Sequence, residues 1–209
     1  MATKPKYYVV WKGRQTGLFA SWEECSVQVT GYPDAQYKAF DSREMAEQAL
    51  RGKYEDYEGK FVSSLSQQRL LEIGPPLLAS YAVDAACTGN PGPVEYRCVH
   101  TETRKEIFRQ GPYEHGTNNV GEFLGLVHAL ALCKKKDLAL PIYSDSESAL
   151  AWVKDKKCKT ELARDARNAE LFDLIERAEK WLAENDYPNP ILKWETEAWG
   201  ENPADFGRK

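Results

Sequence analysis

Long hydrophobic runs are missing from this 209-residue sequence, and none approaches the roughly 18 apolar residues that a membrane-spanning helix needs. Residues 1–6 lack the apolar core of a secretory signal. Histidine is scarce at three residues, and the five cysteines include no CxxC pair. These absences argue against a disulfide framework and against a zinc site. We therefore expect a cytoplasmic protein with free thiols and no membrane association.

Basic charge is also in short supply, with 28 Lys and Arg against 32 Asp and Glu. The imbalance is local. Residues 1–53 carry 8 basic and 6 acidic side chains, which leaves 20 basic and 26 acidic side chains for residues 54–209. Proteins that bind polyanions gain affinity from basic groups, because phosphate contacts release counterions. If the second part of the chain binds nucleic acid, bound cations or the more basic first part must compensate.

The composition divides the chain into two structured blocks and a weaker segment between them. Residues 1–53 alternate short β-rich runs with two helices that begin at capping sequences, in the order β-β-α-β-α. Residues 54–76 are rich in Tyr, Glu, Ser and Gln and close with Gly-Pro-Pro, which predicts a linker with some helix. Residues 77–209 alternate short apolar strands with amphipathic helices, which predicts an α/β domain with a mixed sheet covered by helices.

Two acidic residues stand where apolar strands are predicted to end. Asp84 follows the apolar run 77–83, and Asp145 follows the run 138–143. Ligand sites in α/β sheets gather beyond the carboxyl ends of strands, so both side chains are candidates for one site. Each also has a structural interpretation: Asp84 suits a turn, and Asp145 lies in a Ser-Asp-Ser-Glu capping box.

Glu122 lies one turn into a predicted amphipathic helix that begins at Thr117 or Asn118. The next residues along its face are Leu126 and Ala129, and no Lys or Arg lies within helical reach of its carboxylate. A carboxylate on an apolar face is costly unless a cation reaches it. Either a metal ion or an arginine distant in the sequence would satisfy it.

A fourth acid, Asp205, stands three residues after Asn202, and a capping role is the simpler interpretation of this residue alone. Together, four Asp and Glu residues without His or Cys suit a hard cation such as Mg²⁺ or Mn²⁺. Two such ions form the clamp used for phosphodiester cleavage. They would also offset the acidic charge of the second block where phosphate must bind.

The four acids fall in motifs that together resemble a type 1 ribonuclease H. Asp84 opens Asp-Ala-Ala-Cys-Thr-Gly-Asn-Pro-Gly, Glu122 ends Thr-Asn-Asn-Val-Gly-Glu, Asp145 lies in Tyr-Ser-Asp-Ser, and Asp205 ends Asn-Pro-Ala-Asp. The first motif departs from the family pattern through its two alanines. The resemblance implies a ribonuclease H-like mixed five-stranded sheet with helices on both faces, preceded by a small β-β-α-β-α domain.

The resemblance also implies an activity and the residues that carry it. The activity is endonucleolytic hydrolysis of the RNA strand of RNA–DNA hybrids, leaving 5′-phosphate and 3′-hydroxyl ends. Two Mg²⁺ ions, with Mn²⁺ as a substitute, are implied to bind at Asp84, Glu122, Asp145 and Asp205. The groups implied to contact the hybrid are Cys87, Asn90, Asn118 and Asn119. Short polar groups in a shallow groove can reach the ribose 2′-hydroxyls that distinguish RNA from DNA.

Residues 1–53 are similar to the hybrid-binding, viroplasmin-like domain that precedes many such enzymes. The similarity rests on Tyr-Tyr-Val-Val-Trp-Lys-Gly-Arg at 7–14, Ser-Trp-Glu-Glu-Cys at 21–25 and Tyr-Lys-Ala-Phe at 37–40. It implies that Trp22 and Tyr37 stack on the sugars of the DNA strand while Lys38 holds phosphate.

Other features of the first block have a different interpretation. We expect Tyr7, Trp11 and Phe40 to form a small core instead of a binding surface. Ala39 stands where relatives often carry a second lysine, which suggests weaker binding.

The loop at residues 195–200 contains no histidine, where many family members place one. Glu197 and Glu201 are candidates to replace it, and solvent-facing loop acids are the simpler interpretation.

We expect a monomer that binds RNA–DNA hybrids, with double-stranded RNA as a second ligand of the first block. Two alternatives are a non-catalytic binder of hybrids or double-stranded RNA, and a related polynucleotidyl transferase. The complete acidic set disfavours the binder, since four negative charges facing phosphate only weaken binding. The first block and the Thr-Asn-Asn stretch disfavour the transferase.

Overall fold

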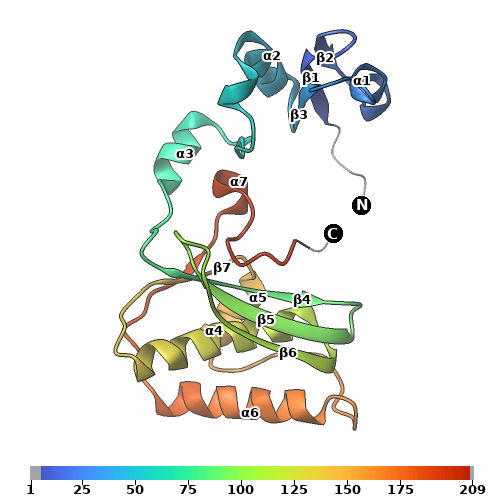
Figure 1. The fold of residues 1–209 in the computed structure, drawn as a ribbon. Coiled ribbons are helices and arrows are strands. Elements are labelled where there is room, and N and C mark those ends of the chain that lie inside the picture. The colour runs from blue at the N-terminus through green and yellow to red at the C-terminus, as the bar shows by residue number, and fades with distance from the viewer. Residues whose placement is uncertain (1–5, 208–209) are drawn as a thin grey trace. The chain divides into compact units, whose positions relative to one another are not determined.

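The computed structural model describes residues 6–207, and the chain separates into two compact units. The first unit comprises Met1–Gly74 with Glu197–Gly200, and the second comprises Pro75–Thr196 with Glu201–Lys209. Each unit has a sheet of its own (Figure 1). Among the described residues, no helix is long and apolar enough to span a membrane.

The first unit has the β-β-α-β-α order that the sequence predicts. Its sheet is antiparallel with the strand order β2-β1-β3. Each helix begins at a serine whose side chain accepts a hydrogen bond from a backbone N–H three residues on: Ser21 from Glu24 and Ser42 from Met45. The elements are β1 (Tyr7–Lys12), β2 (Gly17–Phe19), α1 (Trp22–Val29), β3 (Gln36–Phe40) and α2 (Arg43–Arg51).

Alternate residues of β1 serve two small cores on the two faces of this sheet. Val9 packs with Phe40 and α2, whereas Val10 packs with Cys25 and Val29. Tyr7 and Trp11 pack against the Val9 side. The prediction that Tyr7, Trp11 and Phe40 form a core is therefore confirmed.

Part of the segment 54–76 packs on the same core. The 3-10 helix η1 (Tyr54–Asp56) is followed by Tyr57, whose ring stacks on Trp11 at 5.7 Å between ring centroids. The Trp11 indole N–H donates to the Gly52 carbonyl at 3.1 Å. Helix α3 (Gln67–Ile73) then ends at Gly74, which has a positive φ of 70°. The aromatic packing of the first unit thus continues beyond residue 53.

The second unit contains the predicted ribonuclease H-like mixed five-stranded sheet with helices, although the helices among its described residues pack on one face of the sheet and not on both. The strand order is β6-β5-β4-β7-β8; β4, β5 and β6 are antiparallel, and β4, β7 and β8 are parallel. Its strands are β4 (Tyr81–Cys87), β5 (Gly92–His100), β6 (Glu106–Gly116), β7 (Ile142–Ser144) and β8 (Ile191–Lys193).

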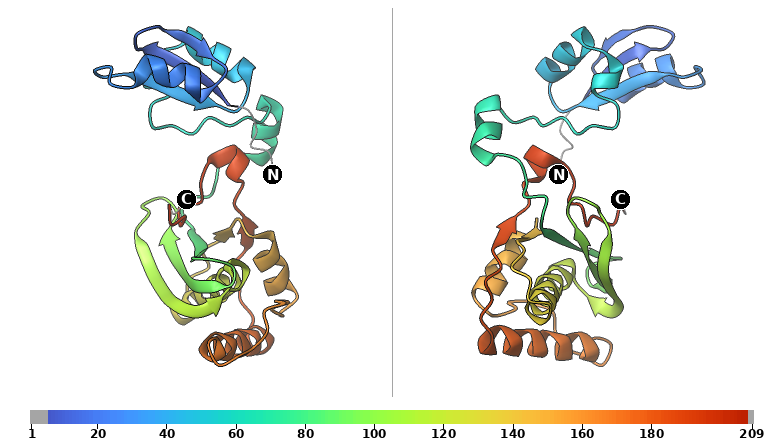
Figure 2. Two further views of the ribbon diagram at one scale, coloured as in Figure 1. Left: turned by 90° about the vertical axis from the view of Figure 1, so that its right-hand side faces the viewer. Right: turned by 60° about the vertical axis from the view of Figure 1, so that its left-hand side comes forward.

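Helix α4 (Asn118–Lys135) lies between the sheet and α6 (Ala169–Glu184), as Figure 2 shows. It is more deeply buried than an amphipathic surface helix, because α5 (Glu147–Lys154) and α6 both pack on it. Gly121 permits its close approach to the sheet. A Cβ there would lie 2.7 Å from a Val94 methyl and 2.8 Å from the Ala85 Cβ. The three helices share one large core on one face of the sheet.

Residues 200–207 form hydrogen bonds to β4 and β5 on the face of the sheet opposite the three helices. Asn202 donates to the Val83 carbonyl of β4 at 2.8 Å, and Arg97 of β5 donates to the Ala204 carbonyl at 2.7 Å. This segment follows the short helix α7 (Thr196–Trp199). Residues far apart in the sequence therefore meet over the central strand β4.

The packing of Tyr57 generates a prediction about stability. Tyr57→Ala should lower the free energy of unfolding of the first unit by roughly 2–3 kcal/mol, because a half-buried ring that packs on Trp11 and Phe40 is removed. Hydrogen exchange of the β1 amides would measure this loss for the first unit alone. Leu71→Ala is the control, since Leu71 is 77% exposed. If the β1 amides of Tyr57→Ala are as well protected as those of the unaltered chain, Tyr57 does not contribute to the stability of the first unit.

Candidate metal centre

Asp84 lies at the middle of β4, where the sheet divides. The prediction that it follows the end of a strand is wrong: β4 pairs with β5 from Tyr81 through Cys87, whereas β4 and β7 pair only at Tyr81 and Ala82. Beyond that point the two parallel strands diverge. Asp145 follows β7 directly, as predicted, and both carboxylates therefore reach the gap between diverging strands.

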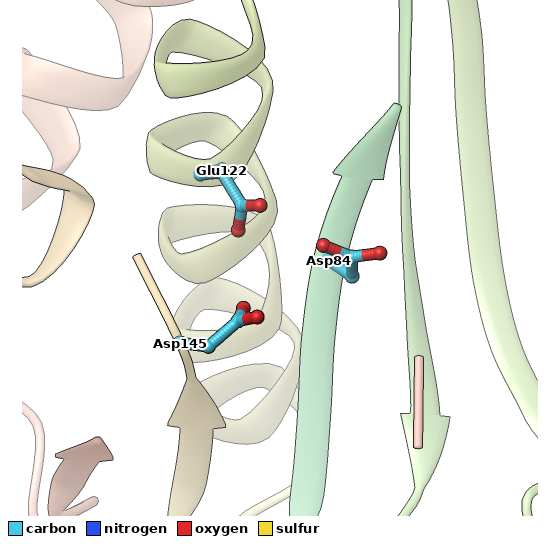
Figure 3. A group of neighbouring side chains, drawn as sticks. All are labelled: Asp84, Glu122 and Asp145. Atoms are coloured by element: carbon cyan, nitrogen blue, oxygen red, sulfur yellow. The ribbon is translucent and has the colours of Figure 1, made fainter. Parts of the chain in front are cut away.

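Glu122 enters the same gap from α4. One carboxylate oxygen from each of Asp84, Glu122 and Asp145 lies within 4.8 Å of the others. Figure 3 shows the three side chains converging from a strand, a helix and a strand end. Asp84 is 8% exposed and Glu122 is 3% exposed, so bulk water screens this cluster poorly.

Several polar groups hold the carboxylates in place. Glu122 accepts hydrogen bonds from the Ala85 N–H at 3.3 Å, the Asn118 amide at 3.4 Å and the Ser144 hydroxyl at 3.3 Å. Asp145 accepts one from the Asn202 amide at 3.2 Å. These donors are neutral, so they orient the acids and leave the negative charge of the cluster unbalanced.

Within residues 6–207, no Lys or Arg forms an ion pair with Asp84, Glu122 or Asp145. The ion pairs elsewhere in that range do not involve these three acids. The arginine distant in sequence that offered a structural explanation for Glu122 is therefore not present among the described residues. A bound cation is the interpretation that remains for an acid buried in this way.

The cluster perturbs the proton affinity of its members. Burial, with the charges of Asp145 and Asp205 adding to it, raises the pKa of Asp84 to about 6, against partial relief from hydrogen bonding. Burial and the charges of Asp84 and Asp145 raise the pKa of Glu122 well above its ordinary value. Hard oxygen donors that repel one another in this way fit a divalent cation such as Mg²⁺ or Mn²⁺.

Asp205 is placed beside the cluster but outside its 4.8 Å group. It lines one pocket with Asp84, Cys87 and Asn118. Its carboxylate accepts a hydrogen bond from the Gly207 N–H at 3.0 Å, and its own N–H donates to the Asn202 carbonyl at 2.8 Å. The capping interpretation and the ligand interpretation of this residue are compatible, because one carboxylate oxygen accepts from Gly207 while the side chain also borders the pocket.

The other residues predicted to contact a hybrid border the neighbouring cleft. Asn90, Asn118 and Asn119 line a cleft of about 760 Å³ in the second unit. Cys87 lies in the adjoining pocket and donates to the carbonyls of Gly92 and Gly116 at 3.5 and 3.4 Å. The four predicted contact residues are thus found on adjoining surfaces next to the acids.

Sequence reasoning missed a basic group in this cleft. Arg167 contacts the Asp165 carboxylate at 2.5 Å and the His115 Nε2 at 3.0 Å, and all three line the cleft. His115 lies two residues before Thr117, and this short spacing to a recognised motif was the available signal. Arg167 had none, because the irregular segment 155–168 brings it there.

In the first unit the structure brings two of the three predicted residues together. Trp22 and Tyr37 are 44% and 40% exposed, with ring centroids 5.8 Å apart. Lys38 alternates to the other face of β3, since it pairs with Val9 whereas Tyr37 pairs with Val10. Its Nζ donates to the Lys60 carbonyl at 2.6 Å.

The candidates for the missing loop histidine fall in different units. Glu197 lies in α7, within the first unit, where its carbonyl accepts a hydrogen bond from the Ser63 hydroxyl at 2.5 Å. Glu201 belongs to the second unit and immediately precedes Asn202. Glu201 therefore belongs to the same unit as Asp205, whereas Glu197 does not.

The raised pKa of Asp84 generates a prediction for the metal-free protein. Its carboxyl binds a proton more tightly in the folded state, so ionisation destabilises the fold above pH 6 and has no effect below its ordinary pKa near 4. Asp84→Asn should therefore raise the free energy of unfolding at pH 8 in EDTA by up to about 3 kcal/mol. The gain should vanish at pH 4. Urea unfolding across this range measures it, with exposed Asp186→Asn as the control. A gain that does not change with pH would contradict the assignment.

Comparison with known proteins finds related families for both units. The family described as "RNase H" matches residues 79–186, and the family described as "Ribonuclease H1 N-terminal domain" matches residues 6–50. The Ribonuclease H of Bradyrhizobium sp. (strain ORS 278) is 31% identical over 110 residues, which cover 49% of this chain and 71% of that protein. The Ribonuclease H of Saccharomyces cerevisiae is 48% identical over 50 residues, or 24% of this chain.

The chain spans only 14% of the length of that Saccharomyces protein and 18% of the Schizosaccharomyces pombe Ribonuclease H. Among solved structures, RNase H1 from Halobacterium salinarum is 23% identical with a TM-score of 0.35, covering 55% of this chain and 83% of that one. The family match over residues 79–186 includes three of the four predicted acids, Asp84, Glu122 and Asp145. By its match to the family model and its identity to a relative, the chain belongs to the ribonuclease H family.

Proposed function

We propose that this chain is an endoribonuclease that hydrolyses the RNA strand of RNA–DNA hybrids. The reaction would take place at Asp84, Glu122, Asp145 and Asp205 with two Mg²⁺ ions, Mn²⁺ being a substitute, and would leave 5′-phosphate and 3′-hydroxyl ends. The observation that supports this most strongly is the set of three carboxylates within 4.8 Å, none of them paired with a Lys or Arg in the described chain.

The donor set decides which ions suit the site. All its side-chain donors are carboxylate oxygens, which favour Mg²⁺ or Mn²⁺ over zinc. When bound, a pair of such ions activates a water for attack on the phosphodiester and stabilises charge on the leaving oxygen. Asp84, Glu122 and Asp145 would hold these ions, and protons on Asp84 and Glu122 would leave as the ions bind.

Hydrogen bonds donated by neighbouring side chains give the carboxylates a fixed orientation. Ser144 and Asn118 donate to different oxygens of Glu122, and Asn202 links Asp145 to the Val83 carbonyl of β4. Such partners reduce the freedom of a ligand before the cation arrives. Asn118 also borders the cleft, so it would connect the cluster with the bound hybrid.

Substrate selection would depend on short polar side chains beside the cluster. Cys87, Asn90, Asn118 and Asn119 border surfaces where ribose 2′-hydroxyls of an RNA strand can be contacted. A DNA strand lacks these hydroxyls and would leave the amides without partners. This difference would direct cleavage to the RNA strand.

The first unit would supply affinity that the acidic second unit lacks. We propose that residues 1–53 bind the hybrid, that 54–76 connect, and that 77–209 cleave. Trp22 and Tyr37 form an exposed aromatic pair suited to stacking, and Lys38 on the other face suits a phosphate contact. A tethered binding module raises the local concentration of substrate at the cleaving unit. Double-stranded RNA is a second candidate ligand of the same unit.

The proposed activity is tested with three end-labelled duplexes: an RNA–DNA hybrid, double-stranded RNA and double-stranded DNA. The full chain should cleave only the RNA strand of the hybrid, with Mg²⁺ or Mn²⁺ and not in EDTA. Asp145→Asn should abolish cleavage while hybrid binding survives, because a neutral amide is a poor ligand for hard cations. The matched control is Asp186→Asn, an exposed acid outside the site. Equal cleavage in EDTA, or wild-type turnover by Asp145→Asn, would contradict the proposal.

The role of the first unit is tested by Trp22→Ala. Stacking is worth about 1–3 kcal/mol per aromatic contact, so the Kd for a long hybrid should rise between about 5-fold and about 150-fold. The kcat at saturating hybrid should stay the same. Val27→Ala is the control on the same helix, since Val27 is 63% exposed. If both variants bind long hybrids as the unaltered chain does, the aromatic pair has another role.

A further inference from the structure

Asp205 differs from the other three acids in the element that carries it. Residues 200–207 are neither helix nor strand, whereas Asp84 lies in β4, Glu122 in α4 and Asp145 at the end of β7. A side chain on irregular backbone needs contacts from other segments to keep one direction. Contacts from β5 and β6 reach this segment next to Asp205, in addition to the hydrogen bonds that Asn202 donates to Val83 and Asp145.

Arg97 of β5 binds both peptide groups that flank Asp205. Its Nε donates to the Ala204 carbonyl at 2.7 Å, and its Nη2 donates to the Asp205 carbonyl at 2.6 Å. The Arg97 side chain is only 20% exposed. Because one planar guanidinium holds the carbonyl before and the carbonyl after Asp205, it fixes the backbone direction at that residue.

The position of Arg97 makes this choice of partner informative. In the β4–β5 pair Arg97 stands directly opposite Asp84, where a cross-strand ion pair is the ordinary outcome. Arg97 instead turns to the C-terminal carbonyls, and its acidic contact is Glu106 at 3.7 Å. The Asp84 carboxylate therefore remains available to a metal ion, although the positively charged Arg97 is its direct cross-strand neighbour.

An aromatic ring and Glu106 contact Arg97 in that orientation, and the same two groups contact Arg109. The β5–β6 register also places Arg97 opposite Arg109, which is unfavourable for two like charges. The Phe206 ring centroid lies 4.8 Å from the Arg97 Cζ and 5.0 Å from the Arg109 Cζ. Arg109 pairs with Glu106 at 2.8 Å and with Glu95 at 3.1 Å. Both cations thus contact one ring, that of Phe206, and one acid, Glu106.

We propose that Arg97, Arg109 and Phe206 form a clasp that directs the Asp205 carboxylate toward the metal centre and keeps Arg97 away from Asp84. The inference rests on the function proposed above, and the three side chains are positioning residues in that reaction. Without the clasp, Asp205 loses its fixed direction, and Arg97 becomes free to neutralise Asp84. Both effects weaken cation binding at the site.

The sign of the effect of Arg97→Gln separates this proposal from simple electrostatics. Removing a positive charge next to a cation site should strengthen Mn²⁺ binding if Arg97 acts only through its charge. The clasp predicts the opposite result. We expect Mn²⁺ binding, measured by titration calorimetry on the full chain, to weaken about tenfold or more, as is typical when groups that orient metal ligands are lost.

Two variants of Phe206 test the ring itself. Phe206→Leu keeps an apolar side chain and removes the aromatic face, and it should weaken Mn²⁺ binding and lower kcat with the KM for hybrid unchanged. Phe206→Tyr keeps the aromatic face and should retain both values. Arg164→Gln is the matched control, because Arg164 forms ion pairs with Asp173 and Glu176 and stacks on Phe172 far along the chain from Asp205.

The clasp is overturned if Arg97→Gln strengthens Mn²⁺ binding or leaves it within twofold of the unaltered chain. It is also overturned if Phe206→Tyr loses as much affinity as Phe206→Leu, or if Arg164→Gln gives the same loss. A thermal unfolding curve for each variant confirms that the protein compared is folded. If the unaltered chain itself neither binds Mn²⁺ nor cleaves hybrid, the proposed function fails first and the role of the clasp fails with it.

Discussion

A carboxylate that is 3% exposed, on a helix packed against a sheet, is the constraint around which the second unit is arranged. Glu122 cannot reach bulk water, and its neighbours Asp84 and Asp145 carry the same charge. Neutral donors orient it and do not neutralise it. The apolar core around α4 has to offset the resulting cost of folding, which falls when a cation binds or when the acids take up protons.

The close packing of α4 is what brings Glu122 to Asp84. Gly121, next to Glu122 in the helix, faces Val94 and Ala85 at distances that leave no space for a Cβ. A side chain there would move α4 away from the sheet and separate Glu122 from β4. The Glu122 carboxylate then meets Asp84 where β4 and β7 diverge, beyond their last paired residue Ala82. Packing of small residues thus determines the electrostatics of the site.

Much of this arrangement could be predicted from local sequence. The motif spacing predicted which acids would be neighbours, and three of the four share the 4.8 Å group. Alternation and capping predicted the order β-β-α-β-α in the first unit. The sequence places the end of β4 four residues too early, at residue 83, because the apolar run stops at the first acid. Pairing with β5 carries the strand past Asp84 to Cys87.

Features that depend on register could not be predicted in the same way. Tyr37 and Lys38 are adjacent in sequence, yet pairing with Val10 and Val9 sends them to opposite faces of β3. The packing of Tyr57 on Trp11 joins residues 46 positions apart through ring contact, with no periodic signal in the segment that contains Tyr57. The local sequence assigns Arg97 no special role, because the two carbonyls to which it donates, those of Ala204 and Asp205, lie more than 100 positions away.

The basic side chains around the acids share one property that explains how the site stays available. Arg97 is engaged by the Ala204 and Asp205 carbonyls, Arg109 by Glu95 and Glu106, and Arg167 by Asp165. A guanidinium free to move would pair with Asp84 or Asp145 and occupy the position of a cation. Because each of these arginines already has acceptors of its own, the positive charge near the substrate surface stays separate from the acids. The unbalanced charge of the cluster then remains for ions from solution.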